Sequence, residues 1–190
     1  MQYLVDLQGF KQPVNDYVLK ELALVAVEPH DAEPTVLLFK PPYSWKRLTN
    51  KYKSENEWLK RRYHGLQWDS GDHEYVDIAN VLRRNLPKAS RIIVNNEIKK
   101  KWMERFVDIS VLPTTVEIFN IQDISYTIGN LPKMTTVCPH HNAASGRKIN
   151  CALHNVKYMK QFYCRSDEME WEDIEESLSP PLLSTVEDYK

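Results

Sequence analysis

The chain opens with three apolar stretches: YLVDLQGF at residues 3–10, YVLKELALVAVEP at 17–29 and TVLLFKPPY at 35–43. Each is rich in leucine, β-branched or aromatic side chains, which favour strands. Polar segments that contain proline separate them, as is typical of turns. We therefore predict three consecutive antiparallel strands.

The sequence then alternates helical and strand patterns. Helices are predicted at 55–65, 75–86, 97–106 and 151–164, and strands at 91–96 and 115–124. Gly65 and Pro87 follow the first two helices, where a helix C-cap and a helix stop are expected. The order βββ-α-α-β-α-β-α predicts one mixed α/β domain over residues 1–164.

Composition excludes several protein classes. Of the 190 residues 27% are charged, and the mean hydropathy is -0.53. No apolar run approaches the roughly 18 residues that a membrane-spanning helix needs. The N-terminus, MQYLVDLQGF, lacks the pattern of a secretory signal. We expect a soluble intracellular protein of the cytoplasm or nucleus.

The net charge of -1 is unevenly distributed along the chain. Residues 1–164 carry 23 basic and 17 acidic side chains, whereas residues 165–190 carry 2 and 9. A run of like charges followed by Ser-Pro-Pro is typical of a solvated extension. We predict that residues 165–190 are an acidic, flexible C-terminal tail, which could fold back on the basic body or compete there with a polyanion.

The element order resembles that of ribonuclease-H-like domains, in which three antiparallel strands precede parallel ones. Enzymes of this fold hold two divalent cations with carboxylates on neighbouring strands, and Asp6 and Glu21 lie in the first two predicted strands. The DEDD exonucleases carry Asp-x-Glu in the first strand, but this chain has Asp6-Leu7-Gln8. The resemblance implies an exonuclease-like mixed sheet flanked by helices, with one acid of the first pair replaced by an amide.

Other positions of the exonuclease signature also lack acids. Lysines 99 to 101 stand where the family places its second aspartate, and Asn150 and Asn155 stand at the two ends of its closing His-x4-Asp motif. Lysines repel metal ions and amides carry no charge. We therefore expect no catalytic residues of the two-metal kind, and expect Asp6 to be a hydrogen-bonded structural carboxylate.

Three cysteines, Cys138, Cys151 and Cys164, lie in the last third of the chain. An odd number is a poor basis for a disulfide framework. Cys138 and His141 form a C-x-x-H pair, Cys151 follows, and thiolates with an imidazole suit zinc. Candidates for a fourth ligand are His140, His154, Cys164 and a distant carboxylate. Ordinary loop histidines and buried cysteines are the alternative interpretation.

The stretch from Cys138 through His141 and Cys151 to Val156-Lys157, with Cys164 beyond it, resembles the zinc-binding segment of the Maelstrom domain. That family is a ribonuclease-H-like domain of the animal germline piRNA pathway, with a Glu-Cys-His-Cys set in place of the exonuclease carboxylates. The resemblance implies the ligands Glu21, Cys138, His141 and Cys151 and one structural Zn²⁺ per chain. Four protein ligands would leave no position for an activated water.

Basic and aromatic residues interleave in two parts of the body. The cations chosen as candidate nucleic-acid contacts are Lys46, Arg47, Lys60, Arg61, Arg62, Lys99, Lys100 and Lys101. Phosphate contacts from such cations, with bases stacked on exposed rings, would form a surface for single-stranded RNA. The alternative is that Trp45, Trp58 and Tyr63 are core residues and that the cations lie on solvated helix faces.

Three functions remain open from the sequence. The first is a zinc-stabilised, catalytically degenerate exonuclease-like domain that binds single-stranded RNA or a protein of a small-RNA pathway. The Maelstrom resemblance implies a role in piRNA or transposon silencing, with perinuclear granules as a possible location. The second is a ribonuclease whose residual cleavage does not depend on the lost carboxylates. The third is a protein-only adaptor that docks through the acidic tail and Trp171.

Overall fold

A computed structural model describes residues 1–13, 16–123, 138–141 and 149–168. Its centre is a five-stranded mixed sheet with the order β3-β2-β1-β4-β5. The first three strands pair antiparallel, and β4 and β5 are added in parallel beside β1. The strands are β1 (Gln2–Gln12), β2 (Asp16–Ala26), β3 (Thr35–Leu38), β4 (Arg91–Val94) and β5 (Glu117–Asn120). The predicted mixed α/β fold is confirmed.

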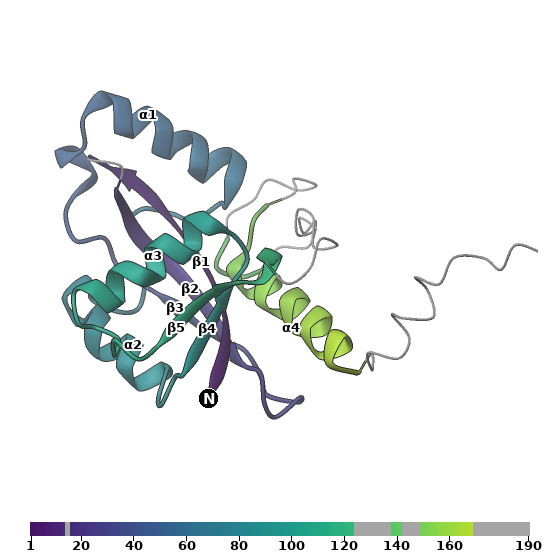
Figure 1. Ribbon diagram of the computed structural model, residues 1–190. Coiled ribbons are helices and arrows are strands. Elements are labelled where there is room, and N and C mark those ends of the chain that lie inside the picture. Colours follow the sequence, from purple (N-terminus) through teal and green to yellow (C-terminus); the bar gives the residue numbers. More distant parts are fainter. Residues whose placement is uncertain (14–15, 124–137, 142–148, 169–190) are drawn as a thin grey trace, which may run out of the picture.

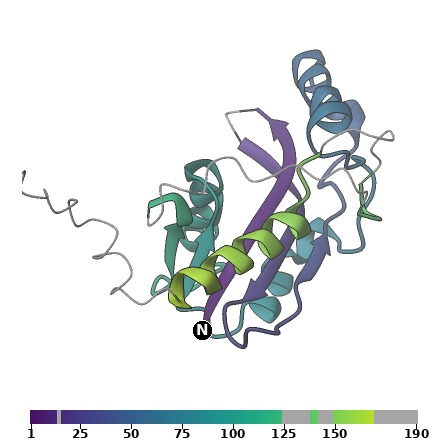
Figure 2. The same ribbon diagram turned by 90° about the vertical axis from the view of Figure 1, so that its right-hand side faces the viewer.

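Helices cover both faces of the sheet (Figures 1 and 2). Helices α2 (Ile78–Asn85) and α3 (Glu97–Asp108) lie on one face, and α4 (Ala152–Glu168) lies on the other. Helix α1 (Asn50–Trp58) lies across the end where β1 finishes, and Asn56 there exchanges hydrogen bonds with the Lys11 backbone. No helix in the described ranges is long and apolar enough to span a bilayer.

Alternation along β1 decides which side chains meet which helix. Successive strand residues point to opposite faces. Tyr3, Val5 and Leu7 pack in the core beneath α2 and α3, whereas Leu4 packs in the core beneath α4. Asp6 shares the parity of Leu4, and it therefore points toward α4.

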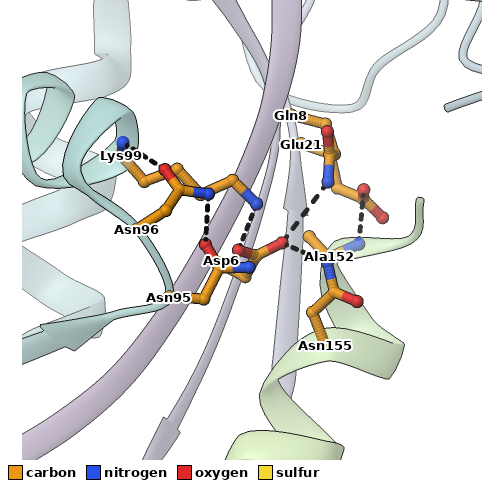
Figure 3. Close-up of polar contacts among 8 residues, drawn as sticks. All are labelled: Asp6, Gln8, Glu21, Asn95, Asn96, Lys99, Ala152 and Asn155. Atoms are coloured by element: carbon orange, nitrogen blue, oxygen red, sulfur yellow. Dashed lines mark hydrogen bonds and ion pairs between the residues drawn. The ribbon is translucent and has the colours of Figure 1, made fainter. Parts of the chain in front are cut away.

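A β-bulge between Gln8 and Gly9 shifts the pairing of β1 with β2. Gln8 pairs with Glu21 in the regular register just before the bulge, and both polar side chains lie near the start of α4 (Figure 3). Gly9 is required here for steric reasons, because a Cβ atom at this position would lie 2.3 Å from the Val18 carbonyl oxygen and 2.9 Å from the Trp102 ring.

Several predicted element boundaries differ from the structure. The helix predicted at 55–65 begins at Asn50 and ends in a π-helical turn, η2 (Leu59–Tyr63), after which Gly65 has φ +74°. The strand predicted at 115–124 is shorter, because its last residues form a 3-10 turn, η4 (Ile121–Asp123). Two further 3-10 turns are η1 (Trp45–Arg47) and η3 (Tyr75–Asp77).

The predicted boundary between domain and tail also moves. Helix α4 continues to Glu168, beyond the expected end of the domain at residue 164. Residues 169–190, with Trp171 and most of the predicted acidic tail, lie outside the described residues.

Candidate metal centre

Cys138, His141 and Cys151 come together at the N-terminus of α4. One possible ligand atom from each side chain lies within 4.8 Å of the others, and all three residues are buried. Cys138 and His141 belong to one short turn, in which the His141 N–H donates to the Cys138 carbonyl at 3.0 Å. Cys151 immediately precedes α4. This group could hold a metal ion.

Contacts on both sides orient the His141 ring. Its Nδ1 contacts the backbone carbonyl of His64, and its Nε2 lies 2.9 Å from Glu21 Oε1. Because a carbonyl oxygen only accepts, Nδ1 must donate. Nε2 faces a carboxyl oxygen, and this contact requires either a proton on one of the two atoms or a metal cation shared by both.

Glu21 joins β2 to the candidate metal centre. Its side chain is fully buried, and its second oxygen, Oε2, accepts from the Ala152 N–H at 3.1 Å. That N–H belongs to the first turn of α4, where an unpaired donor and the helix dipole favour an acceptor of negative charge. The predicted ligand Glu21 thus lies against the predicted ligand His141, from which it is 120 residues distant in sequence.

Burial changes the proton affinities of the group. Desolvation, followed by the nearby Glu21 carboxylate, raises the pKa of the Cys151 thiol. Burial alone would lower the pKa of His141, but the Glu21 carboxylate and the His64 carbonyl outweigh it and raise that pKa. These shifts favour a protonated Cys151 thiol and a protonated His141 ring. A cation could replace those protons, because buried thiols, an imidazole and a carboxylate are a donor set that proteins use for transition metals.

A second buried polar cluster surrounds Asp6, one strand away (Figure 3). Lys99 Nζ forms an ion pair with Asp6 Oδ1. Asn155 Nδ2 donates to Asp6 Oδ2 at 2.9 Å, and Gln8 Nε2 reaches the same oxygen at 3.4 Å. Burial raises the pKa of Asp6, and the Lys99 ammonium and the Asn155 amide oppose that shift.

Two helix ends deliver these partners to Asp6. Asn96 caps α3 by accepting from the Lys99 N–H at 3.0 Å, which places Lys99 in the first turn, directly after β4. Asn155 lies in the first turn of α4, where its N–H donates to the Cys151 carbonyl at 3.0 Å. The described partners of Asp6 are thus an ammonium and two amides. Asp6 sits in a neutralised ion pair, as the structural interpretation predicted.

Two comparisons with known proteins found no match for this chain. No protein-family model matches it, and no curated protein matches it. Its chemistry follows from its own residues and their geometry.

The candidate fourth ligands have different surroundings. His140 is exposed beside the buried His141, and His154 is half-buried in α4. The side chain of Cys164 lies outside the described residues. The Glu21 carboxylate, the distant acid among these candidates, lies 2.9 Å from His141 Nε2.

Most of the predicted nucleic-acid contacts lie on the surface. Exposed members are Lys46, Arg47, Arg61, Arg62 and Lys101, and partly buried ones are Lys60 and Lys100. Lys99 requires a correction. Its side chain is 9% exposed and is paired with Asp6, so it is not available to a phosphate.

The sequence did not indicate that His64 contacts a candidate metal ligand. The His64 ring is buried, with Nε2 3.2 Å from the Gly9 carbonyl and Nδ1 accepting from the Leu66 N–H at 3.1 Å. Burial lowers the pKa of His64 to about 3. Its carbonyl also orients His141, and no sequence pattern marks a backbone acceptor of this kind.

Proposed function

We propose that this chain is a zinc-stabilised, catalytically degenerate exonuclease-like domain that binds single-stranded RNA. The observation that carries the proposal is the contact of Glu21 with His141 at 2.9 Å, beside two buried cysteines. These four residues are the ones that the Maelstrom resemblance implies as ligands. A role in a germline small-RNA or transposon-silencing pathway is proposed on that resemblance.

The donor types support zinc as the ion. Cys138 and Cys151 offer soft thiolates, His141 offers Nε2, and Glu21 offers one carboxylate oxygen, a combination that suits a four-coordinate zinc ion. When bound, such an ion supplies structural cross-linking, because four protein ligands close its coordination shell. The residues themselves tie β2, the turn at 138–141 and the start of α4 together.

The surroundings of Asp6 support the loss of two-metal catalysis. A two-metal site needs several anionic ligands facing the cations. Here the Asp6 carboxylate is paired with the Lys99 ammonium, and its second oxygen accepts from Asn155. A divalent cation would have to displace a buried ammonium group to reach this carboxylate.

The exposed cations support RNA as the partner. Five of the eight cations predicted to bind nucleic acid are exposed, and the segment 45–63 carries seven basic and two acidic residues. Phosphate contacts from such residues make binding depend on ionic strength. This segment also presents the exposed ring of Trp58, on which an unpaired base can stack.

Metal analysis tests the first half of the proposal. The purified protein should hold about one zinc ion per chain, and Glu21→Gln and Cys151→Ser should both lose it. His140→Ala is the matched control, because His140 lies next to His141 but is exposed. Zinc retained in full by Glu21→Gln would remove Glu21 from the ligand set and would reject the proposed site.

RNA binding tests the second half. Affinity for a labelled oligouridine should fall steeply as salt is raised, and the bound RNA should show no cleavage that depends on added Mg²⁺. Cleavage that requires Mg²⁺ and disappears in Asp6→Asn would instead establish a surviving two-metal nuclease.

A further inference from the structure

Trp58 is an exposed tryptophan at the end of α1. Its side chain is 57% exposed, whereas Trp68 is 4% exposed and packs with Phe10 in the core. The indole therefore offers a large apolar face to solvent, against which a flat aromatic partner could stack. Trp58 is therefore not a core residue, contrary to the alternative interpretation of the sequence.

The Trp58 ring is backed by a second aromatic ring. Tyr63 lies under it, with ring centroids 6.2 Å apart and an angle of 23° between the planes. This nearly parallel pair limits the rotation of the indole, which lowers the entropy lost when a third ring stacks on it. Tyr63 itself is half-buried, so the pair connects the surface to the body of the domain.

The backbone below the pair is also fixed. Residues Leu59–Tyr63 form a π-helical turn, a feature frequent at functional sites. The Tyr63 carbonyl accepts from the Asn150 N–H at 2.8 Å, and the His64 carbonyl contacts His141. The backbone of Tyr63 and His64 thus contacts the same segments that carry candidate metal ligands, and Trp58 stacks on Tyr63.

The charge around this aromatic pair favours a polyanion. Lys60, Arg61 and Arg62 follow Trp58 closely in the chain. Nearby acids are already engaged, since Glu57 contacts Lys60 and Arg61, and Glu55 contacts Lys11. An exposed stacked indole flanked by several cations offers a base-stacking surface and phosphate partners together. A basic protein surface would be repelled by those cations.

We propose that Trp58, stacked on Tyr63, is a platform on which one base of single-stranded RNA stacks, while Arg62 and its basic neighbours contact the adjacent phosphates. This inference rests on the proposed RNA-binding function and names its contact site. Stacking is tolerant of base identity, so the platform would give affinity with little sequence preference.

Fluorescence anisotropy with labelled oligouridine tests the platform. Trp58→Ala should weaken binding roughly 5- to 100-fold, and Trp58→Phe should recover most of that loss because it keeps an aromatic face. Tyr158→Ala is the matched control, since Tyr158 is a 39% exposed aromatic residue on α4, and this variant should bind RNA as the wild type does. Arg62→Gln should lower the slope of affinity against salt by about one ion, whereas Trp58→Ala should leave the slope unchanged.

The outcomes separate the two proposals. Wild-type protein that fails to bind oligouridine would reject the proposed function itself. RNA binding that is equal in Trp58→Ala and wild type, with unfolding midpoints also equal, would reject the platform and leave the RNA-binding function standing. Loss of a protein partner in Trp58→Ala with RNA affinity unchanged would also overturn the platform and assign this surface to protein docking.

Discussion

Replacing Lys99 with methionine removes the ammonium group that faces the buried Asp6 carboxylate. The two side chains are 9% and 0% exposed, so bulk water cannot replace the lost cation without opening the core. Methionine approaches lysine in length and keeps an apolar stem. The experiment therefore isolates the charge, and it measures what an uncompensated carboxylate costs between β1 and α4.

The magnitude follows from what remains around Asp6. After the substitution, the described donors to the carboxylate are Asn155 Nδ2 at 2.9 Å and Gln8 Nε2 at 3.4 Å, both neutral. Removal of one partner from a buried ion pair destabilises a protein by about 3–5 kcal/mol. With a urea m-value of about 1–3 kcal/mol/M, the unfolding midpoint should fall by roughly 1–5 M. That loss is a large fraction of the roughly 5–15 kcal/mol that stabilises a typical domain.

Urea unfolding followed by circular dichroism measures this change. Lys101→Met is the matched control, because Lys101 lies in the same helix with its side chain 70% exposed, and it should change stability by less than about 0.5 kcal/mol. The double variant Asp6→Asn, Lys99→Met should regain part of the lost stability, since neither residue of the former ion pair then carries a charge. A stability for Lys99→Met within about 1 kcal/mol of wild type would refute the assignment of a charged, buried Asp6–Lys99 pair.

Three other perturbations have expected outcomes. Gly9→Ala should destabilise the fold by about 2 kcal/mol or more in urea unfolding, because its Cβ would lie 2.3 Å from the Val18 carbonyl oxygen; a wild-type midpoint would contradict the close backbone approach at this bulge. Zinc binding should release protons, because burial raises the pKa of the Cys151 thiol, which must lose its proton to bind the metal. Calorimetry in buffers of different ionisation enthalpy measures this release, and binding heats that do not depend on the buffer would contradict it. Chelation of the metal should lower the thermal unfolding midpoint and weaken oligouridine binding together, and added zinc should restore both. The reason is that the His64 carbonyl contacts His141 and directly follows the turn at Leu59–Tyr63. A lower midpoint with unchanged RNA affinity would show that the two sites are not coupled.

Local patterns predicted most of the fold correctly. The three antiparallel strands, the helix that stops at Pro87 and the helix after Cys151 all appear at or near their expected places, because hydrophobic periodicity and turn residues act over a few neighbouring positions. The boundaries that moved lie where tertiary contacts decide. Helix α1 begins at Asn50, earlier than its apolar pattern suggests, and Tyr52 in this added turn packs against the core cluster of Phe10 and Trp68.

The candidate site was only partly predictable. Cys138 and His141 are recognisable by spacing alone, because both lie in one turn. Glu21 could be named only through the family resemblance, since its contact with His141 spans 120 residues. The sequence left open whether Trp58 is exposed or a core residue, and the structure shows that it is exposed. Lys99 was predicted to contact nucleic acid but is buried. Composition does not reveal which face of a helix a side chain occupies.

Local patterns in the sequence account for the kinds of elements and their order, because hydrophobic periodicity and turn residues involve only neighbouring positions. The pairing of Lys99 with Asp6, 93 residues away, and the contact of Glu21 with His141 appear only in the folded chain. Contacts between such distant side chains depend on sheet order and strand register, which many local patterns would permit equally well.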